Sequence, residues 1–337
     1  MRKSVGLVPS SWLVVFSLTV IACLLVPACQ QKVKPPVEKV TIAVPTLPDA
    51  ALLYVAHAKN YFAEEGLEIT FRKYPYGKIA LDAMISGESE FAASTESPVM
   101  FAAMKGAEIL VVAQTMTSVK DLAIVARRKS GIGLPADLKG KKIGFPAGTS
   151  AEYFLDVFLT VHTIPEGTVK TVPMKPDDMD DALKTGRVDA VAIWNPYLSI
   201  FAKQYGKEVV LFFDETIYVE TFLVTGKKAF VTAHPETVKK IIRALIKAED
   251  FVRKNQAESI DIMVEAIKVD KEAIKEYWPV YQFVVNLDQS LLVNLESQGR
   301  WAIRNRLSDR KEVPNFLDLF YLDALKTVKP DAVTVIR

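Results

Sequence analysis

Cysteine and histidine are scarce in this chain of 337 residues. Its two cysteines, Cys23 and Cys29, both lie near the N-terminus, so the remainder can form neither a disulfide framework nor a thiolate metal site. The three histidines, His57, His162 and His234, are far apart, and neither an HExxH motif nor a CxxC pair occurs. We therefore expect no bound metal and no resident cofactor.

Neither sign of charge is in excess. Lysine and arginine total 42, aspartate and glutamate total 40, and no polybasic block is present. This balance gives no electrostatic reason to expect a nucleic-acid partner. Half of the residues are hydrophobic and 24% are charged, which is typical of a folded globular chain rather than a disordered one. The length suits two domains better than one.

A long uncharged segment follows a short basic start. Arg2 and Lys3 precede a largely apolar run that gives way to polar sequence at Gln30. This layout is typical of a secretory signal. We predict that residues 1–28 are a signal peptide and that the rest of the chain lies outside the cytoplasm.

The end of this run resembles a bacterial lipobox. Residues 26–29 read VPAC: an aliphatic residue, two small residues, and Cys29, whose sulfur would be acylated and would anchor the protein to the membrane. Residues 29–38, which include two prolines, then form a lipid-anchored tether. Cys23 is a second candidate for lipidation. An uncleaved anchor is the alternative, since the uncharged run is long enough to span a bilayer.

Beyond the tether, strand-like segments alternate with helix-like segments. Strands are expected at 40–45, 67–74, 91–94, 109–113 and 122–126, and helices at 52–65, 79–86 and 97–106, the last of them capped by Ser97. This alternation predicts an α/β architecture with helices on both faces of a sheet. After Ala233, long helical stretches at 235–254, 257–268 and 287–306 indicate a helical C-terminal tail that packs on the first lobe.

An internal repeat with a spacing of about 100 residues is the most informative feature of the chain. Residues 42–45 resemble 143–146, residues 83–90 resemble 182–189, and residues 106–108 resemble 206–208. The repeat indicates two related α/β lobes. Ligands of open α/β sheets bind outside the carboxyl ends of the strands. Four loops are expected there, at 46–49, 94–97, 147–150 and 194–196, and they meet in one cleft if the lobes face each other.

Five motifs occur in order along the chain: YFAEEGL at 61–67, DLKGKKIG at 137–144, GTS at 148–150, GRVDA at 186–190 and WNP at 194–196. Together they resemble the solute-binding proteins of ABC importers that take up sulfonates, taurine, nitrate and thiamine-precursor pyrimidines. The resemblance implies a two-lobe periplasmic-binding-protein fold of type II, with the ligand cleft between the lobes. It places residues 39–122 and 219–337 in lobe 1 and residues 123–218 in lobe 2. It also implies a monomer without enzymatic activity, whose partners are an ABC permease and its ATPase.

The second lobe supplies most of the candidate ligand contacts. The segment 148–150 precedes a helix, where backbone N–H groups and the helix dipole favour an anion, although an ordinary helix cap has the same composition. Trp194 ends a buried strand at the cleft edge, where an indole can stack on a ring or a cation. The candidates in this lobe are Gly148, Thr149, Ser150, Tyr153, Trp194 and Asn195.

In the first lobe the candidates are Asp49, Thr95 and Glu96, which stand on the equivalent loops. Gln114 and Glu220 fall where the crossing strands should lie, so they are candidate hinge residues.

The charges of these loops predict the chemistry of the ligand. None of the four loops contains lysine or arginine, whereas Asp49 and Glu96 bring carboxylates. A purely anionic ligand would meet repulsion there, so we expect an amine-bearing sulfonate such as taurine, or an aminopyrimidine, rather than nitrate or a simple alkanesulfonate. The function predicted is an extracytoplasmic solute-binding lipoprotein. An enzyme of thiamine-pyrimidine synthesis with the same fold, or an extracytoplasmic sensor, remains an alternative.

Overall fold

The computed structural model describes Met1, Ser4, Gly6 and residues 37–336. Most of the predicted signal peptide, both cysteines and most of the predicted tether lie outside the described residues. Among the helices that are described, none combines the length and the apolar character needed to cross a membrane.

The first lobe is built on a six-stranded mixed sheet with the order β11-β4-β10-β3-β1-β2. β1 pairs in parallel with β2 and β3, whereas β10 runs antiparallel to β3 and β4. The strands are β1 (Glu38–Pro45), β2 (Leu67–Tyr74), β3 (Phe91–Thr95), β4 (Ile109–Ser118), β10 (Glu220–Lys227) and β11 (Gln282–Asn286).

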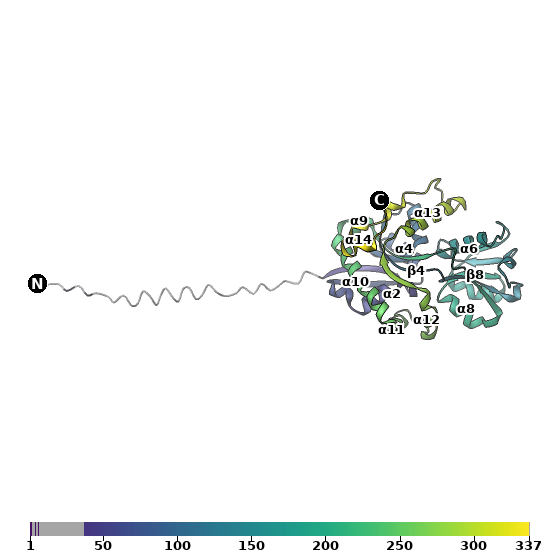
Figure 1. Ribbon diagram of the computed structural model, residues 1–337, viewed down its shortest axis with the longest axis horizontal. Coiled ribbons are helices and arrows are strands. Elements are labelled where there is room, and N and C mark those ends of the chain that lie inside the picture. The colour runs from purple at the N-terminus through teal and green to yellow at the C-terminus, as the bar shows by residue number, and fades with distance from the viewer. Residues whose placement is uncertain (2–3, 5, 7–36, 337) are drawn as a thin grey trace. The chain divides into compact units, whose positions relative to one another are not determined.

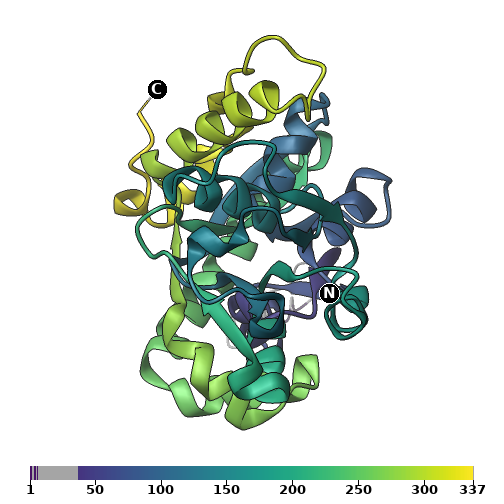
Figure 2. The ribbon, with the colours of Figure 1, turned by 90° about the vertical axis from the view of Figure 1, so that its right-hand side faces the viewer.

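The second lobe is built on a five-stranded sheet with the order β7-β6-β8-β5-β9. Its strands are β5 (Leu122–Arg127), β6 (Lys142–Phe145), β7 (Lys170–Pro173), β8 (Ala190–Trp194) and β9 (Val209–Phe212). The chain passes from the first sheet to the second over residues 119–121 and returns over residues 213–219. Each sheet belongs to its own cluster of buried apolar side chains. Figure 2 looks onto the second lobe, in teal, with the first lobe behind it.

Helices cover both sheets. Those of the alternating part are α2 (Ala51–Ala58), α3 (Tyr61–Glu64), α4 (Gly77–Ile85), α5 (Glu96–Met104), α6 (Ser150–Val161), α7 (Met179–Thr185) and α8 (Tyr197–Tyr205). Those of the C-terminal part are α9 (Lys228–Ala233), α10 (Pro235–Lys254), α11 (Gln256–Ile267), α12 (Lys271–Tyr277), α13 (Gln289–Arg304) and α14 (Leu322–Val328). Figure 1 shows α10, α13 and α14 beside the first sheet and α6 and α8 beside the second. The predicted α/β architecture and helical tail are confirmed.

Two predicted helix boundaries are wrong for local reasons. The helix expected over 52–65 is interrupted at Asn60, whose φ of 60° is left-handed and separates α2 from α3. The helix expected to be capped by Ser97 begins earlier, at Glu96, with Thr95 as the N-cap residue. Ser97 therefore lies inside the first turn, where its hydroxyl donates to the Glu96 carboxylate at 3.3 Å.

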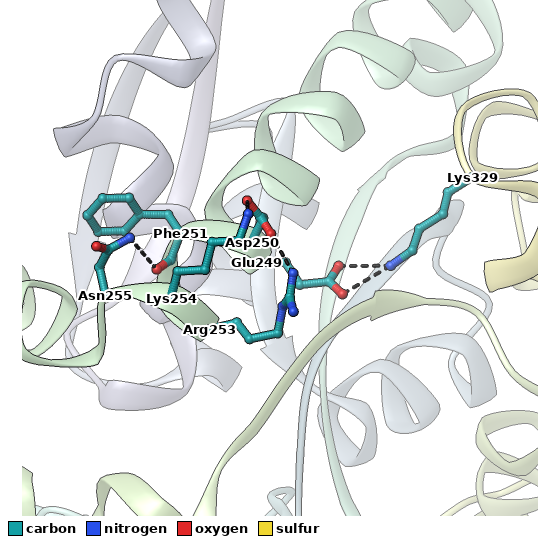
Figure 3. A network of polar contacts seen from close by, with 7 residues as sticks. All are labelled: Glu249, Asp250, Phe251, Arg253, Lys254, Asn255 and Lys329. Atoms are coloured by element: carbon teal, nitrogen blue, oxygen red, sulfur yellow. Dashed lines mark hydrogen bonds and ion pairs between the residues drawn. The ribbon is translucent and has the colours of Figure 1, made fainter.

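The C-terminal tail is fastened to the first lobe by polar contacts as well as by its apolar face. Lys329, just after α14, donates to both carboxylate oxygens of Glu249 on α10, at 3.1 and 2.9 Å (Figure 3). It also donates to the carbonyl of Val285 on β11 at 3.1 Å. Asp250, the next residue of α10, instead pairs with Arg253 and Lys254 of its own helix, at 2.6 and 2.7 Å. Glu249 Oε2 also accepts the backbone N–H of Val285 at 3.0 Å, so Glu249 and Lys329 together hold α10 and the end of the tail against β11.

Candidate functional site

A narrow cavity lies where the carboxyl ends of strands from both lobes meet. The first lobe contributes the loop after β1, the start of α4 and the end of β3, and the second lobe contributes the start of α6 and the end of β8. The returning strand β10 closes the cavity. The lining residues are Leu47, Asp49, Tyr76, Gly77, Lys78, Thr95, Pro98, Thr149, Ser150, Trp194, Glu220 and Phe222.

Five of the nine candidate contacts line this cavity: Asp49, Thr95, Thr149, Ser150 and Trp194. They come from all four loops that the repeat singled out. Gly148 lies at the cavity rim, with a left-handed φ of +72° and a position where an added Cβ would come within 3.0 Å of Lys78 Cε. Because Lys78 belongs to the first lobe and Gly148 to the second, the two lobes touch at this edge of the cavity.

The other three candidates are engaged with protein groups instead. Tyr153 packs edge-on against Tyr218, with ring centroids 5.3 Å apart. Asn195 donates from Nδ2 to Asp121 Oδ1 at 3.2 Å. Glu96 is fully buried and accepts hydrogen bonds from Gln298 Nε2 at 2.7 Å, the Thr221 backbone N–H at 2.8 Å and the hydroxyls of Ser97 and Tyr218.

Three buried polar atoms of the lining residues have no hydrogen-bond partner among the residues that the structure describes: Asp49 Oδ1, Glu220 Oε2 and Trp194 Nε1. Asp49, Glu220 and Trp194 are only 6%, 2% and 5% exposed, so solvent does not readily satisfy these atoms. A buried polar atom without a partner costs about 1–3 kcal/mol. The cavity therefore offers two acceptors and one donor to a ligand.

A cluster of carboxyl groups surrounds this part of the cavity. Burial, and after it the neighbouring Asp121, raise the pKa of Asp49 well above its ordinary value. Burial, followed by the charges of Asp121 and Glu96, likewise raises the pKa of Glu220. Burial also raises the pKa of Glu96 and Asp121, although hydrogen bonds to both oppose the shift. A cation close to these carboxyl groups would stabilise their ionised forms.

One cation does reach the cavity, and it already has a partner. Lys78 Nζ lies 2.6 Å from Asp82 Oδ2 on the next turn of α4. Lys78 lies at the rim of the cavity, next to Gly148. Asp49 and Glu220 belong to other elements, η2 (Pro48–Ala50) and β10.

The start of α6, expected to receive an anion, is partly occupied by the protein itself. The Gly148 backbone N–H donates to Glu152 Oε2 at 2.6 Å, and Ser150 Oγ donates to Glu220 Oε1, also at 2.6 Å. Thr149 Oγ1 donates to the carbonyl of Pro146 at 2.7 Å. These contacts leave fewer free donors for a ligand anion than the loop sequence suggests.

Several lining residues were not predicted from the sequence. Tyr76, Gly77 and Lys78 follow β2, whose segment falls outside the matched stretches of the repeat, so no pattern pointed to them. Tyr76 packs against Trp194 across the cavity, with ring centroids 5.9 Å apart. The sequence indicates Glu220 only as a hinge residue; in the structure it is the first residue of β10, directly after the return crossing, and it also lines the cavity.

Comparisons with known proteins agree with this architecture. A protein of Brucella abortus (strain 2308) named as a binding protein is 28% identical over 222 residues, which are 64% of this chain and 67% of that protein. The taurine-binding periplasmic protein of Escherichia coli (strain K12) is 29% identical over 219 residues, 62% of this chain and 65% of that protein.

Among solved structures, the alkanesulfonate-binding protein SsuA from Xanthomonas axonopodis pv. citri, bound to MOPS, has a TM-score of 0.75 and 20% identity. The match covers 86% of this chain and 99% of that one. The periplasmic-binding-protein fold predicted from the motifs is confirmed, as is the resemblance to binding proteins for sulfonates and taurine. The model of the NMT1/THI5-like family matches residues 47–259, more than half of the sequence, and the chain belongs to that family.

Proposed function

We propose that this protein is an extracytoplasmic solute-binding lipoprotein that captures a small organic ligand with an amine-bearing end and delivers it to an ABC importer. Cys29 carries the lipid anchor, and the protein is a monomer without enzymatic activity. Residues 39–122 and 219–337 form one lobe of the clamp and residues 123–218 form the other. The importer's permease and ATPase are its partners.

The observation that carries the proposal is the cavity lined by both lobes at the chain crossings. It contains the unpartnered atoms Asp49 Oδ1, Glu220 Oε2 and Trp194 Nε1. A ligand that satisfies atoms from both lobes binds the closed arrangement more tightly than an open one, so ligand binding favours closure. A two-state protein of this kind suits delivery, because the bound and free forms present different surfaces to a transporter.

The charge of the cavity supports an amine at one end of the ligand. The side chains of Asp49 and Glu220 line the cavity, and Lys78, at the cavity rim, is paired with Asp82. A charge-assisted hydrogen bond contributes about 1.5–3 kcal/mol in such a site, and an unpaired anion there would cost at least as much. An amine-bearing sulfonate or an aminopyrimidine-like molecule meets this requirement, with its acceptor atom on Trp194 Nε1. Thr95, Thr149 and Ser150 are the further contacts proposed.

Calorimetry on two matched pairs of compounds tests this proposal. Taurine and ethanesulfonate differ by one amine, and so do 4-aminopyrimidine and pyrimidine. We expect the amine-bearing member of at least one pair to bind at least tenfold more tightly. Preference for ethanesulfonate, pyrimidine or nitrate over both amines contradicts the proposal. Native mass spectrometry of gently purified protein identifies the physiological ligand, and co-purification with a permease tests the delivery step.

A further inference from the structure

Glu220 is the lining residue whose carboxyl group joins the two lobes. It is the first residue of β10, in the first lobe, and its Oε1 accepts from Ser150 Oγ of the second lobe at 2.6 Å. Its Oε2 is buried and unpartnered among the described residues. The direction of this carboxyl group depends on the backbone at residues 218–221, where the returning chain enters the first sheet.

Both peptide units that flank Glu220 are held by side chains of the first lobe. The N–H of Thr221, in the peptide unit after Glu220, donates to Glu96 Oε2 at 2.8 Å. The carbonyl of Val219, in the peptide unit before Glu220, accepts from Asn294 Nδ2 at 3.2 Å. Because the peptide units are planar, their orientations fix where the side chain of Glu220 leaves the backbone. Glu96 and Asn294 therefore set the direction of the Glu220 carboxyl group from two sides.

Gln298 links these two supports. Its Nε2 donates to Glu96 Oε1 at 2.7 Å and to Asn294 Oδ1 at 3.1 Å, so α5 and α13 are joined through one amide group. Glu96 Oε1 also accepts from the hydroxyl of Tyr218. Since Tyr218 lies two residues before Glu220, Glu96 contacts the returning chain on both sides of Glu220.

These contacts require a carboxylate at position 96. Glu96 is completely buried, and both of its oxygens accept from N–H groups, Oε1 from Gln298 and Oε2 from Thr221. A glutamine side chain has the same shape but only one acceptor oxygen, so its own N–H group would face one of those two donors. None of the donors to Glu96 is a cation, and a buried carboxylate without a cationic partner is costly. A demand for fold stability alone would be met at lower cost by an uncharged residue.

We propose that Glu96 is a positioning residue of the ligand site, because its contacts fix the backbone around Glu220 and so hold the Glu220 carboxyl group where it receives the amine of the ligand. The inference rests on the proposed function, since it explains how one group of that same cavity is kept in place. It also replaces the direct contact that the sequence indicated for Glu96. Its chain neighbours Thr95 and Pro98 line the cavity, whereas the Glu96 side chain contacts the returning chain.

Calorimetry on Glu96→Gln with taurine and ethanesulfonate tests this role. We expect taurine to bind roughly tenfold more weakly and ethanesulfonate, which lacks the amine, to change by less than about twofold. 4-Aminopyrimidine and pyrimidine replace this pair if the wild type does not bind taurine. Glu296→Gln is the matched control, because Glu296 lies on the same helix as Gln298 but pairs with Arg300, at 3.4 Å. An equal loss of affinity for both compounds would mean that Glu96 supports the fold in general, and it overturns the inference.

A double-mutant cycle separates action through Glu220 from a direct effect of Glu96 on the ligand. In the Glu220→Gln background we expect Glu96→Gln to change taurine affinity by less than about twofold, since the carboxylate that it positions is already absent. Effects of the two substitutions that simply add overturn the inference. Circular dichroism establishes that each variant is folded. Should Glu96→Gln fail to fold, Asn294→Ala takes its place in both tests, because it removes the bond to Val219 from a half-buried site.

Crystal structures of the ligand-free wild type and Glu96→Gln test the positioning without any ligand. We expect the Glu220 carboxyl group to leave Ser150 in the variant. Glu220 unmoved and still bonded to Ser150 overturns the inference and leaves the proposed function intact. Failure of both taurine and 4-aminopyrimidine to bind the wild type counts against the proposed function, and the crystal structures still decide the role of Glu96.

Discussion

Trp301 on α13 donates its indole N–H to Asp156 on α6, with 2.9 Å between Nε1 and Oδ2, and this hydrogen bond joins the first lobe to the second. Tyr153, one turn before Asp156, packs edge-on against the same indole, with centroids 5.1 Å apart. The contact lies outside the ligand cavity, so it acts on the relative positions of the lobes and not on the ligand directly. Opening of the clamp has to break it.

We therefore expect Trp301→Phe to weaken ligand binding without changing ligand preference. Phenylalanine keeps much of the apolar contact but lacks the N–H, so the closed form loses one hydrogen bond to a carboxylate, about 1.5 kcal/mol or roughly tenfold in affinity. Calorimetry with the best ligand measures the change. Glu296→Gln is the control, since Glu296 lies on the same helix and pairs with Arg300 of that helix, at 3.4 Å. Equal affinity of the wild type and Trp301→Phe for the ligand would show that the hydrogen bond between Trp301 and Asp156 does not stabilise the closed form.

The pH dependence of stability offers a second prediction. Burial and the charge of Asp121 raise the pKa of Asp49 above its ordinary 3.8, so the folded state holds this proton more tightly than the unfolded state. This proton's contribution to stability is fully present below pH 3.8, the ordinary pKa of the group, and it is lost as the pH rises through the raised pKa of the folded state. We expect Asp49→Asn, which cannot ionise, to gain stability relative to the wild type as the pH rises, by at most about 1.4 kcal/mol per pH unit.

Urea unfolding at several pH values measures this difference. Asp137→Asn is a control of opposite sign, because Asp137 accepts the backbone N–H groups of Gly133 and Leu134, at 2.9 and 2.8 Å, and these bonds lower its pKa. The stability of Asp137→Asn should therefore fall relative to the wild type as the pH rises through the lowered pKa. If the difference in unfolding free energy between Asp49→Asn and the wild type did not change with pH, the pKa of Asp49 would not be raised in the folded protein.

The indole of Trp194 gives a third prediction. Its N–H has no partner in the described part of the chain, so Trp194→Phe removes a donor that makes no hydrogen bond there. We expect that variant to bind the ligand about fivefold to tenfold more weakly, since a ligand acceptor loses about 1 kcal/mol of hydrogen bonding. Stability measured by thermal unfolding should change far less than affinity. Unchanged affinity would show that the ligand does not use this N–H.

Much of the fold could be predicted from the sequence because its signals are local. The alternation of apolar residues and the flanking proline place β1, and the proline that begins α10 stands at the boundary that was expected. The repeat of about 100 residues was enough to locate the loops that meet at the cavity. Such features depend on neighbours in the chain, which a single sequence displays.

The chemistry of the site depends on pairs that are remote in sequence. Glu96 stands on a predicted loop, but its oxygens are occupied by Thr221 and Gln298, which belong to the returning strand and the tail. Asp121, on the outgoing crossing, accepts hydrogen bonds from Asn195 of the second lobe and from Tyr281 of the tail. Nothing in the spacing of these residues reveals such contacts, so the sequence indicated the cleft and its charge but not which carboxyl groups remain free.

The membrane anchor is the last prediction, and it concerns residues outside those the structure describes. The diacylglyceryl group is attached to a cysteine sulfur through a thioether, so serine at position 29 cannot accept the lipid. We expect Cys29→Ser to move the protein from the membrane fraction to the soluble fraction and to abolish incorporation of a labelled fatty acid. Cys23→Ser is the matched control and should keep both the label and the membrane association. Label that survives Cys29→Ser but is lost in Cys23→Ser would place the lipid on Cys23, and membrane association of an unlabelled wild type would favour an uncleaved anchor instead.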